Sequence, residues 1–215
     1  MGAFTGWPAE AVDFYRGLEA DNSKAYWTAH RTVYDESVLA PMQALLEDLV
    51  AEFGEGRIFR PYRDIRFSAD KSPYKTAIGA TVGDSGYVQF SAAGLGVGGG
   101  CHVMAPDQLA RFRAAVDDDR SGEALVAAVA AVEADGVGVS SSERLKRVPR
   151  GFDPEHPRAE LLRDKDLTAW IEWPVEPWLH TPAAETRVVG ALHASRPLTD
   201  WLDAHVGPST AERSR

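Results

Sequence analysis

The chain has 215 residues, of which 44% are hydrophobic and 26% charged, and these are ordinary values for a globular protein. The formal net charge of −9 argues against a general nucleic-acid coat protein, because such a protein needs a positive surface to neutralise phosphates. No apolar run is long enough to cross a bilayer, so we expect no membrane partner.

The cellular compartment is indicated by two negative features. The start of the chain lacks the basic residues and the apolar stretch of a secretory signal. Cys101 is the only cysteine, so no disulfide can form within the chain. Both features fit a reducing compartment, and we expect a cytoplasmic protein.

The first fifty residues predict helices. Pro8 suits the first turn of a helix that continues to about Ala20, and Asn22 or Ser23 can cap a second helix. One face of that second helix carries residues at i, i+3, i+4 and i+7 spacing, namely Trp27, His30, Arg31 and Tyr34. Pro41 should kink or restart the helix. The segment after it carries an apolar stripe of Met42, Leu45, Leu46, Leu49, Val50 and Phe53.

The middle of the chain predicts short strands. The expected strands are residues 58–67 with a break at Pro61, residues 77–82, residues 87–92 and residues 94–104. Residues 83–86, with a glycine at each end, are typical of a hairpin turn.

The last hundred residues predict mostly helices. The expected elements are helices at 106–116 and 121–135, a loop at 136–155 with a strand near 145–148, a short helix at 157–164, a strand at 167–173, a helix at 181–194 and a restart at Pro197. We therefore expect the α+β class, a mainly antiparallel β-meander with helices packed on it. Residues 1–207 should form a single domain, and residues 208–215 a disordered tail.

Basic residues are concentrated in two windows of this acidic chain. Residues 57–75 contain six basic and two acidic residues, and residues 144–165 contain seven basic and four acidic ones. The two windows are candidates for one shared positive surface.

The first window also has features of a fixed cation array. If residues 62–67 form a strand, Ile65 and Phe67 face the core, and Arg66 lies on the open face with Asp64. Asp64 could then orient the Arg66 guanidinium toward a phosphate or carboxylate. The alternative is that Arg66–Asp64 and Arg63–Asp70 are structural ion pairs that hold a turn.

The glycines of residues 94–100 and the second helix could contribute to the same site. Gly94, Gly96, Gly98 and Gly100 share one face of a strand, and that bare face implies close approach of a ligand, a helix or another backbone. The aromatic and guanidinium groups on the second helix suit an anionic or planar ligand. Alternatively, these aromatic residues are core and Arg31 pairs with Asp35.

Metal and cofactor signals are lacking. The six histidines include no i, i+4 pair, and the chain has no Cys-x-x-Cys motif, so we expect no metal site. The pattern Gly94-x-Gly96-x-x-Gly99 matches a dinucleotide fingerprint but is not followed by a helix, so we expect no cofactor.

Four blocks of the chain resemble the family called domain of unknown function 2461. The blocks are Tyr62–Lys75, the N-terminal pattern Leu18, Asn22, Trp27, Arg31 and Tyr34, the run Gly98–Gly100, and Leu145–Pro157. Two departures from the family pattern are Cys101-His102, where an aromatic residue is expected, and the alanine-rich helix from Ser121. The resemblance implies a single intracellular domain and supports the choice of residues, but it implies no activity.

Three functional hypotheses follow. The first is a pocket for a small anionic ligand that bears phosphate or carboxylate, with residues 94–100 as its floor. Its expected ligand-binding residues are Arg63, Arg66, Lys71, Tyr74, Lys75, Trp27, Arg31 and Tyr34. If a reaction occurs there, His30 or Asp64 would carry the proton. The second, which we favour less, is a nucleic-acid or protein interaction module that uses a basic stripe. The third is a structural scaffold without a ligand site.

Overall fold

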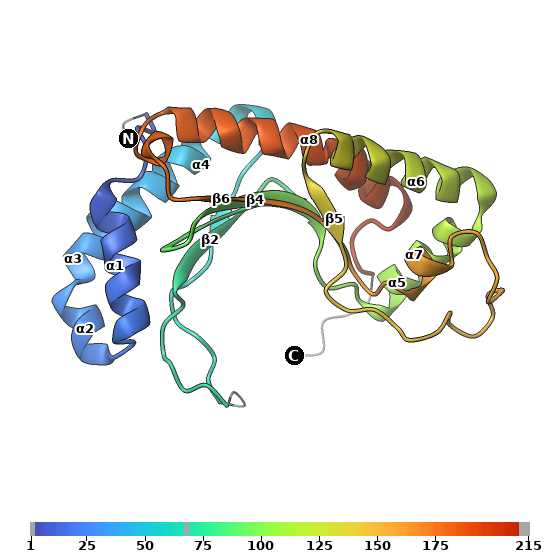
Figure 1. The fold of residues 1–215 in the computed structure, drawn as a ribbon, viewed down its shortest axis with the longest axis horizontal. Helices are drawn as coiled ribbons and strands as arrows, with labels where there is room; N and C mark the ends of the chain where they lie inside the picture. The colour runs from blue at the N-terminus through green and yellow to red at the C-terminus, as the bar shows by residue number, and fades with distance from the viewer. Residues whose placement is uncertain (1–2, 67–68, 211–215) are drawn as a thin grey trace. The chain divides into compact units, whose positions relative to one another are not determined.

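The computed structural model describes residues 3–66 and 69–210 (Figure 1). Contacts within the chain define two compact units, which we call unit 1 (Met1–Val97 and Glu172–Gly190) and unit 2 (Gly98–Ile171 and Ala191–Arg215). The expectation of a single domain stays a prediction. Of the tail predicted to be disordered, residues 211–215 lie outside the described residues, whereas Ser209 and Thr210 hydrogen-bond to Asp107.

The fold class is α+β, as predicted: a six-stranded antiparallel sheet with helices packed against it. The strand order is β1-β2-β3-β4-β6-β5, so the first four strands follow the chain as a meander. The strands are β1 (Arg57–Ile58), β2 (Ala77–Val82), β3 (Gly86–Ser91), β4 (Gly94–Cys101), β5 (Gly138–Ser140) and β6 (Leu167–Pro174). The larger helices are α1 (Ala9–Ala20), α2 (Lys24–Ala29), α4 (Ala40–Phe53), α5 (Pro106–Asp117), α6 (Asp119–Ala134) and α8 (Ala183–His205).

The helices of unit 1 begin and end where local chemistry allows. Ser23 caps α2 by accepting a hydrogen bond from the Tyr26 amide, as predicted. The short helix α3 (Arg31–Val33) and a π-helical turn (Tyr34–Leu39) then lead into α4, which has Pro41 in its first turn. Pro41 has no amide hydrogen to donate to the preceding turn of the helix, and the wider π-helical turn lies directly before α4.

The β2–β3 hairpin separates a buried face from an open one. Its register pairs Ile78 with Phe90 and Ala80 with Val88, and all four of these side chains are buried. The core on that side includes Trp7, which stacks on Phe90 with ring centroids 4.9 Å apart. Because side chains alternate along a strand, the opposite face carries Ala77, Gly79 and Thr81 on β2 and Tyr87, Gln89 and Ser91 on β3.

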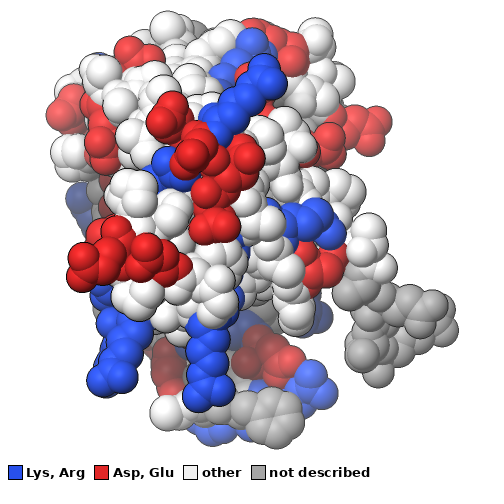
Figure 2. Space-filling model, turned by 90° about the vertical axis from the view of Figure 1, so that its right-hand side faces the viewer, with Lys and Arg blue, Asp and Glu red and all other residues white. Residues whose placement is uncertain are grey.

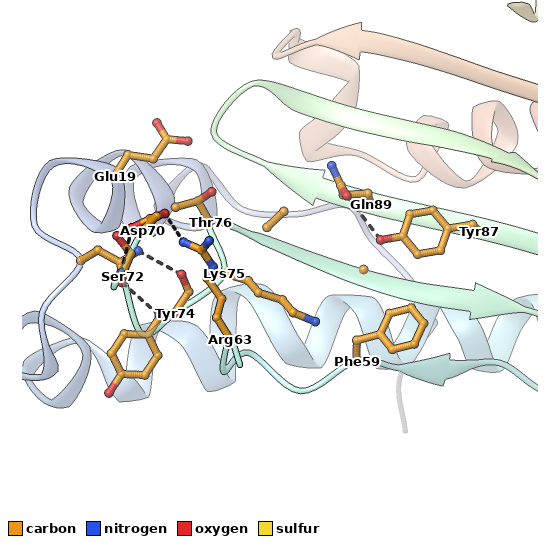
Figure 3. Close-up of a pocket in the computed structure, with 13 residues that line it drawn as sticks. Glu19, Phe59, Arg63, Asp70, Ser72, Tyr74, Lys75, Thr76, Tyr87 and Gln89 are labelled. Atoms are coloured by element: carbon orange, nitrogen blue, oxygen red, sulfur yellow. Dashed lines mark hydrogen bonds and ion pairs between the residues drawn. The ribbon is translucent and has the colours of Figure 1, made fainter. Parts of the chain in front are cut away.

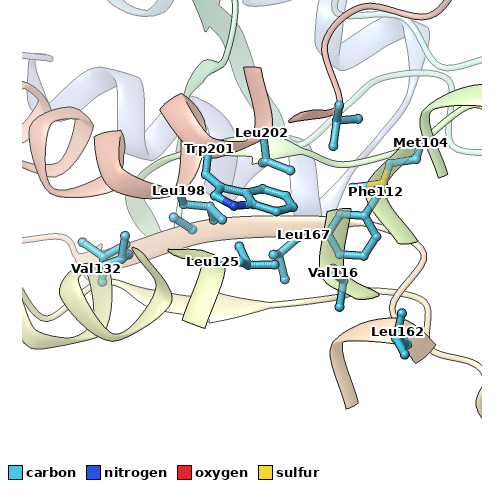
Figure 4. Close-up of a cluster of buried hydrophobic side chains, with 13 residues drawn as sticks. Met104, Phe112, Val116, Leu125, Val132, Leu162, Leu167, Leu198, Trp201 and Leu202 are labelled. Carbon is cyan, nitrogen blue, oxygen red and sulfur yellow. The ribbon is translucent and has the colours of Figure 1, made fainter. Parts of the chain in front are cut away.

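Unit 2 has its own hydrophobic core, centred on Trp201 of α8 (Figure 4). The Trp201 indole N–H donates to the carbonyl oxygen of Ser121 at 2.9 Å, and its ring meets Phe112 edge to face at 6.0 Å. Leu125 of α6 and Leu167 of β6 complete the centre of this cluster. The short helix α7 (Ala159–Arg163) adds Leu162.

Several sequence predictions were wrong in detail. The strand predicted at 58–67 ends at Ile58, the strand near 145–148 is absent from the described residues, and β4 ends at Cys101. Helix α8 runs through Pro197 without a restart, because the buried residues that follow it hold the helix in place. Val50 belongs to the predicted apolar stripe but is 43% exposed. Phe67, expected in the core, lies outside the described residues.

Glycines of β4 permit close approach of the neighbouring strand. A β-carbon built on Gly98 would lie 1.9 Å from the carbonyl oxygen of Ala169, and one on Gly100 would lie 2.5 Å from that of Leu167. A β-carbon on Gly94 would lie 2.0 Å from the carbonyl oxygen of Trp173. The sequence predicted that a ligand, a helix or another backbone would lie close to these glycines. The structure shows another backbone, that of β6.

Candidate functional site

The basic segment forms a narrow loop that is closed by backbone hydrogen bonds. The Arg63 amide donates to Pro73 O at 2.9 Å, and the Lys75 amide donates to Pro61 O at 2.8 Å, on either side of a Tyr62–Tyr74 bridge. The described part of the segment is therefore a loop with one bridge rather than a strand, and the alternating faces expected for it do not apply to residues 62–66.

Tyr74 fastens this loop to the helices. The Asn22 side chain donates to Tyr74 O and accepts from the Tyr74 amide, both at 3.0 Å. The Tyr74 ring stacks on Trp27 with centroids 4.3 Å apart and planes 6° from parallel. Both rings are buried, so the side of the loop that bears Lys75 is held at a fixed position.

Most cations of this loop have internal partners. Arg63 pairs with Asp70, and Arg66 makes two hydrogen bonds to Asp64, at 3.0 and 2.7 Å. Lys71 donates to the carbonyl oxygen of Ile65 at 3.0 Å. The structural ion pairs raised as an alternative are therefore present.

These contacts fix the charge of both carboxylates. Hydrogen bonds from Arg63, and then from Ser72, hold the pKa of Asp70 well below its usual range. A hydrogen bond from the Arg66 guanidinium lowers the pKa of Asp64. Both groups stay ionised at neutral pH, so Asp64 does not suit the proton-carrying role considered for it.

Arg31 of α3 lies against aromatic residues of the two neighbouring elements, Trp27 of α2 and Tyr34 of the π-helical turn. Its guanidinium donates to both oxygens of Asp35, at 2.9 and 2.8 Å, and lies 5.7 Å from the Trp27 ring centroid and 5.8 Å from that of Tyr34. Burial raises the pKa of Tyr34 to about 12. His30 departs from this group, because its ring stacks on Tyr26.

A cavity of about 560 Å³ opens beside the loop in unit 1 (Figure 3). Its lining residues are Glu19, Asn22, Phe59, Arg63, Asp70, Ser72, Tyr74, Lys75, Thr76, Ala77, Gly79, Tyr87 and Gln89. The floor is the open face of the β2–β3 hairpin, which contributes Ala77, Gly79, Tyr87 and Gln89. The expected floor, residues 94–100, is not among the described residues that line the cavity.

Lys75 is the cation that faces this cavity without a carboxylate. Its ammonium lies 5.4 Å from the centroid of the Phe59 ring, and no carboxylate among the described residues pairs with it. Figure 3 shows the side chain extended from the loop toward Phe59. The Phe59 amide donates to Gly79 O at 2.9 Å, so the backbone that bears this ring is joined to the sheet.

The four charged side chains among the described residues that line the cavity balance in formal charge. Arg63 and Asp70 neutralise each other, which leaves Lys75 and the exposed Glu19. In Figure 3, Glu19 lies at the end of the cavity away from Phe59 and Tyr87. Selectivity for an anion would therefore come from the position of the Lys75 ammonium rather than from net charge.

Three of the eight predicted ligand residues line the cavity, namely Arg63, Tyr74 and Lys75. The predicted residues that lie outside its lining are Arg66, Lys71, Trp27, Arg31 and Tyr34. Sequence reasoning missed Phe59, Tyr87 and Gln89. The alternation of small and polar residues along residues 77–91 was a signal that could have found the floor.

The second basic window is mostly engaged in unit 2. Arg144 pairs with the buried Asp164, Arg158 donates to the carbonyl oxygen of Val116 at 2.7 Å, and Lys165 pairs with Glu143. Three exposed cations, Lys146, Arg147 and Arg150, have no partner among the described residues. On the face shown in Figure 2, basic side chains are interspersed with acidic and neutral ones.

The described ranges 3–66 and 69–210 contain neither a metal cluster nor a membrane-spanning helix. No cluster of three or more His, Cys, Asp or Glu side chains there could hold a metal ion. No helix in that part of the chain is both long enough and apolar enough to cross a membrane.

The chain belongs to the family described as conserved hypothetical protein DUF2461, whose model matches residues 10–201. The match confirms the resemblance seen in the sequence blocks. No curated protein and no solved structure matches the chain.

Proposed function

We propose that the chain binds a small ligand bearing a phosphate or carboxylate in the cavity of unit 1. The observation that carries the proposal is the Lys75 ammonium, which faces a cavity of about 560 Å³ without a carboxylate among the described residues. That volume lies within the range of small-molecule sites, roughly 300–1,000 Å³.

The energetics of Lys75 favour capture of an anion. A cation over a phenyl ring at a partly exposed site gains about 0.5–1 kcal/mol. A hydrogen bond between charged groups contributes about 1.5–3 kcal/mol. An incoming anion can therefore draw the ammonium away from Phe59 with a net gain.

Neighbouring donors would complete the anion's coordination. Arg63 has five N–H donors, and its pairing with Asp70 does not use all of them. Ser72 and Thr76 line the same cavity and carry hydroxyl groups. Together these groups could surround an oxyanion that Lys75 binds first.

The test is calorimetric titration of methyl phosphate and acetate into three proteins: the wild type, Lys75→Met, and the matched control Lys146→Met. We expect binding to the wild type, at least tenfold weaker binding to Lys75→Met, and an unchanged affinity for Lys146→Met, whose side chain is exposed in unit 2. Equal affinity in all three proteins would overturn the proposal.

A structural scaffold is the second candidate, and the ion pairs Arg63–Asp70 and Arg66–Asp64 favour it. It predicts that Arg66→Ala destabilises the fold and that neither anion raises the melting temperature. If the protein binds an anion, the anion should instead raise the melting temperature. The stabilisation should grow with the logarithm of the anion concentration once that concentration exceeds the dissociation constant.

A further inference from the structure

We infer that the ligand carries a planar ring next to its anionic group, and that this ring takes the place of the Lys75 ammonium over Phe59. The inference rests on the proposed function, and it names the chemical class of ligand for the same cavity. An aromatic carboxylate or a phosphorylated ring compound fits this description, whereas a bare inorganic anion does not.

The two ends of the cavity differ in chemistry. One end gathers the charged and hydroxyl groups of Arg63, Asp70 and Ser72, and the other is formed by Phe59, Tyr87 and Gln89 (Figure 3). A phosphate or carboxylate alone would use only the first end. The second end therefore needs a ligand with an apolar part.

The aromatic end consists of two neighbouring rings. The rings of Phe59 and Tyr87 have centroids 6.1 Å apart and planes inclined by 38°. Tyr87 lies across Gly79, where an added β-carbon would be 2.2 Å from the phenol oxygen. The absence of a side chain at Gly79 thus lets the Tyr87 ring lie along the sheet and form an apolar surface in the floor.

Both residues are positioned by hydrogen bonds. The backbone of Phe59 donates to Gly79 O, and the Tyr87 hydroxyl donates to the Gln89 side-chain oxygen at 3.3 Å. A fixed aromatic surface binds a ring at lower entropic cost than mobile side chains would. Aromatic rings also favour offset or edge contacts with another ring over contact with a saturated group of equal size.

Lys75 links the two ends. Its ammonium lies 5.4 Å from the centroid of the Phe59 ring, and the Arg57 guanidinium lies 5.6 Å from the same centroid. When an anion binds, the ammonium turns toward the anion and uncovers the part of the Phe59 ring that it covered, while Arg57 keeps its own contact with the ring. The ring attached to that anion can then occupy the uncovered face, so one side chain couples recognition of charge to recognition of the ring.

The test compares three phosphate monoesters of equal charge: methyl, cyclohexyl and phenyl phosphate. By calorimetry with the wild type we expect phenyl phosphate to bind about tenfold more tightly than methyl phosphate, and several-fold more tightly than cyclohexyl phosphate. In Phe59→Leu, which keeps an apolar side chain, the preference for phenyl over cyclohexyl should disappear. Methyl phosphate should bind this variant within about threefold of the wild type.

A second measurement needs no variant. In the free wild type, the ring current of Phe59 should shift the NMR signals of the Lys75 ε-methylene protons upfield. Addition of phenyl phosphate should move these signals toward their ordinary position. Retention of the upfield shift at saturation would overturn the inference even if Phe59→Leu does not fold.

The outcomes separate the two proposals. Suppose the wild type binds the three esters with equal affinity and Lys75→Met weakens each of them. The inference about the ring would then be wrong, and the proposed anion site would stand. The same conclusion would follow if the preference for phenyl phosphate persisted in Phe59→Leu. If methyl phosphate fails to bind, or binds Lys75→Met as well as the wild type, the proposed function fails and the ring inference falls with it.

Discussion

At the scale of single residues, Asn22 has the most consequential contact of the candidate site. Its side-chain amide hydrogen-bonds to both the N–H and the C=O of Tyr74, 52 positions away in the chain. In a sheet, a neighbouring strand would make these two bonds. Sequence reasoning had considered Asn22 as a helix cap, a role that Ser23 fills. Local patterns indicate caps, but they contain no information on which distant backbone a side chain meets.

Asn22→Ala should therefore destabilise the protein by about 2–3 kcal/mol, since two hydrogen bonds are lost and two backbone groups of the buried Tyr74 lose their partners. Urea unfolding measures the change. The control is Gln43→Ala, which removes an exposed amide from α4 and should alter stability by less than about 0.5 kcal/mol. Equal effects of the two substitutions would show that the Asn22–Tyr74 hydrogen bonds do not stabilise the fold.

Tyr34 gives a prediction at alkaline pH. Burial raises its pKa to about 12 in the folded protein, against 10.0 as the ordinary value. Below pH 10 the phenol is protonated in both states, and its contribution to stability is fully present. Between pH 10 and 12 only the unfolded state loses the proton, so stability should fall by roughly 1.4 kcal/mol per pH unit.

Tyr34→Phe removes the titrating group and should lose less stability across that window, by a total of about 2–3 kcal/mol. The measurement is the free energy of unfolding in urea at pH 9 and at several values up to pH 12. Parallel pH profiles for wild type and variant would show that Tyr34 is not held in its neutral form.

At the scale of secondary-structure elements, glycine has opposite roles in β4 and α8. Gly98 lies against the backbone of β6, whereas a β-carbon on Gly190 of α8 would meet nothing within 4 Å beyond its own helix. Gly98→Ala should destabilise the protein by about 3 kcal/mol or more, because backbone cannot yield as a side chain can. Gly190→Ala should stabilise it by roughly 0.5–1 kcal/mol.

Thermal and urea unfolding of both glycine variants test these predictions. The two variants should change the free energy of unfolding in opposite directions. A stable Gly98→Ala protein would mean that β4 and β6 do not approach as closely as the structure shows. Loss of stability in Gly190→Ala would mean that its position in α8 is more crowded than the structure shows.

Elements whose limits depend on local chemistry were well predicted from the sequence. The helix from Ala9 to Ala20 and the strand from Ala77 to Val82 match their predictions closely. The strand predicted over 58–67 was wrong because the backbone of that segment bonds within its own loop and to Asn22. The predicted break at Pro197 was wrong because burial of Leu198 and Trp201 outweighs one lost backbone hydrogen bond.

The cavity was only partly predictable, because local sequence patterns do not show which distant segments meet in the fold. Arg63, Tyr74 and Lys75 lie within one conspicuous sequence block, so their grouping needs no knowledge of the fold. Phe59 and Tyr87 come near each other only through the register of the β2–β3 hairpin and the Phe59–Gly79 hydrogen bond. The sequence offered the pairs Arg63–Asp70 and Arg66–Asp64 as an alternative to an anion site, and only the structure shows that both pairs are formed.

At the scale of the whole molecule, charge weighs against a nucleic-acid partner. The net charge is −9, and both basic windows direct much of their positive charge at internal acceptors. We expect a mixed-sequence oligonucleotide to bind no more tightly than about 10⁻⁴ M at physiological salt, as judged by fluorescence anisotropy. Tighter binding that falls steeply with salt, and that Lys146→Met weakens, would support a basic stripe instead.

The central claim is that Lys75 receives an anion in the cavity of unit 1, and a crystal structure with phenyl phosphate tests it most directly. We predict density for the phosphate within about 3 Å of the Lys75 Nζ atom, with the ammonium turned away from Phe59. Density for the phosphate at other residues only, with Lys75 still over the Phe59 ring, would contradict the account.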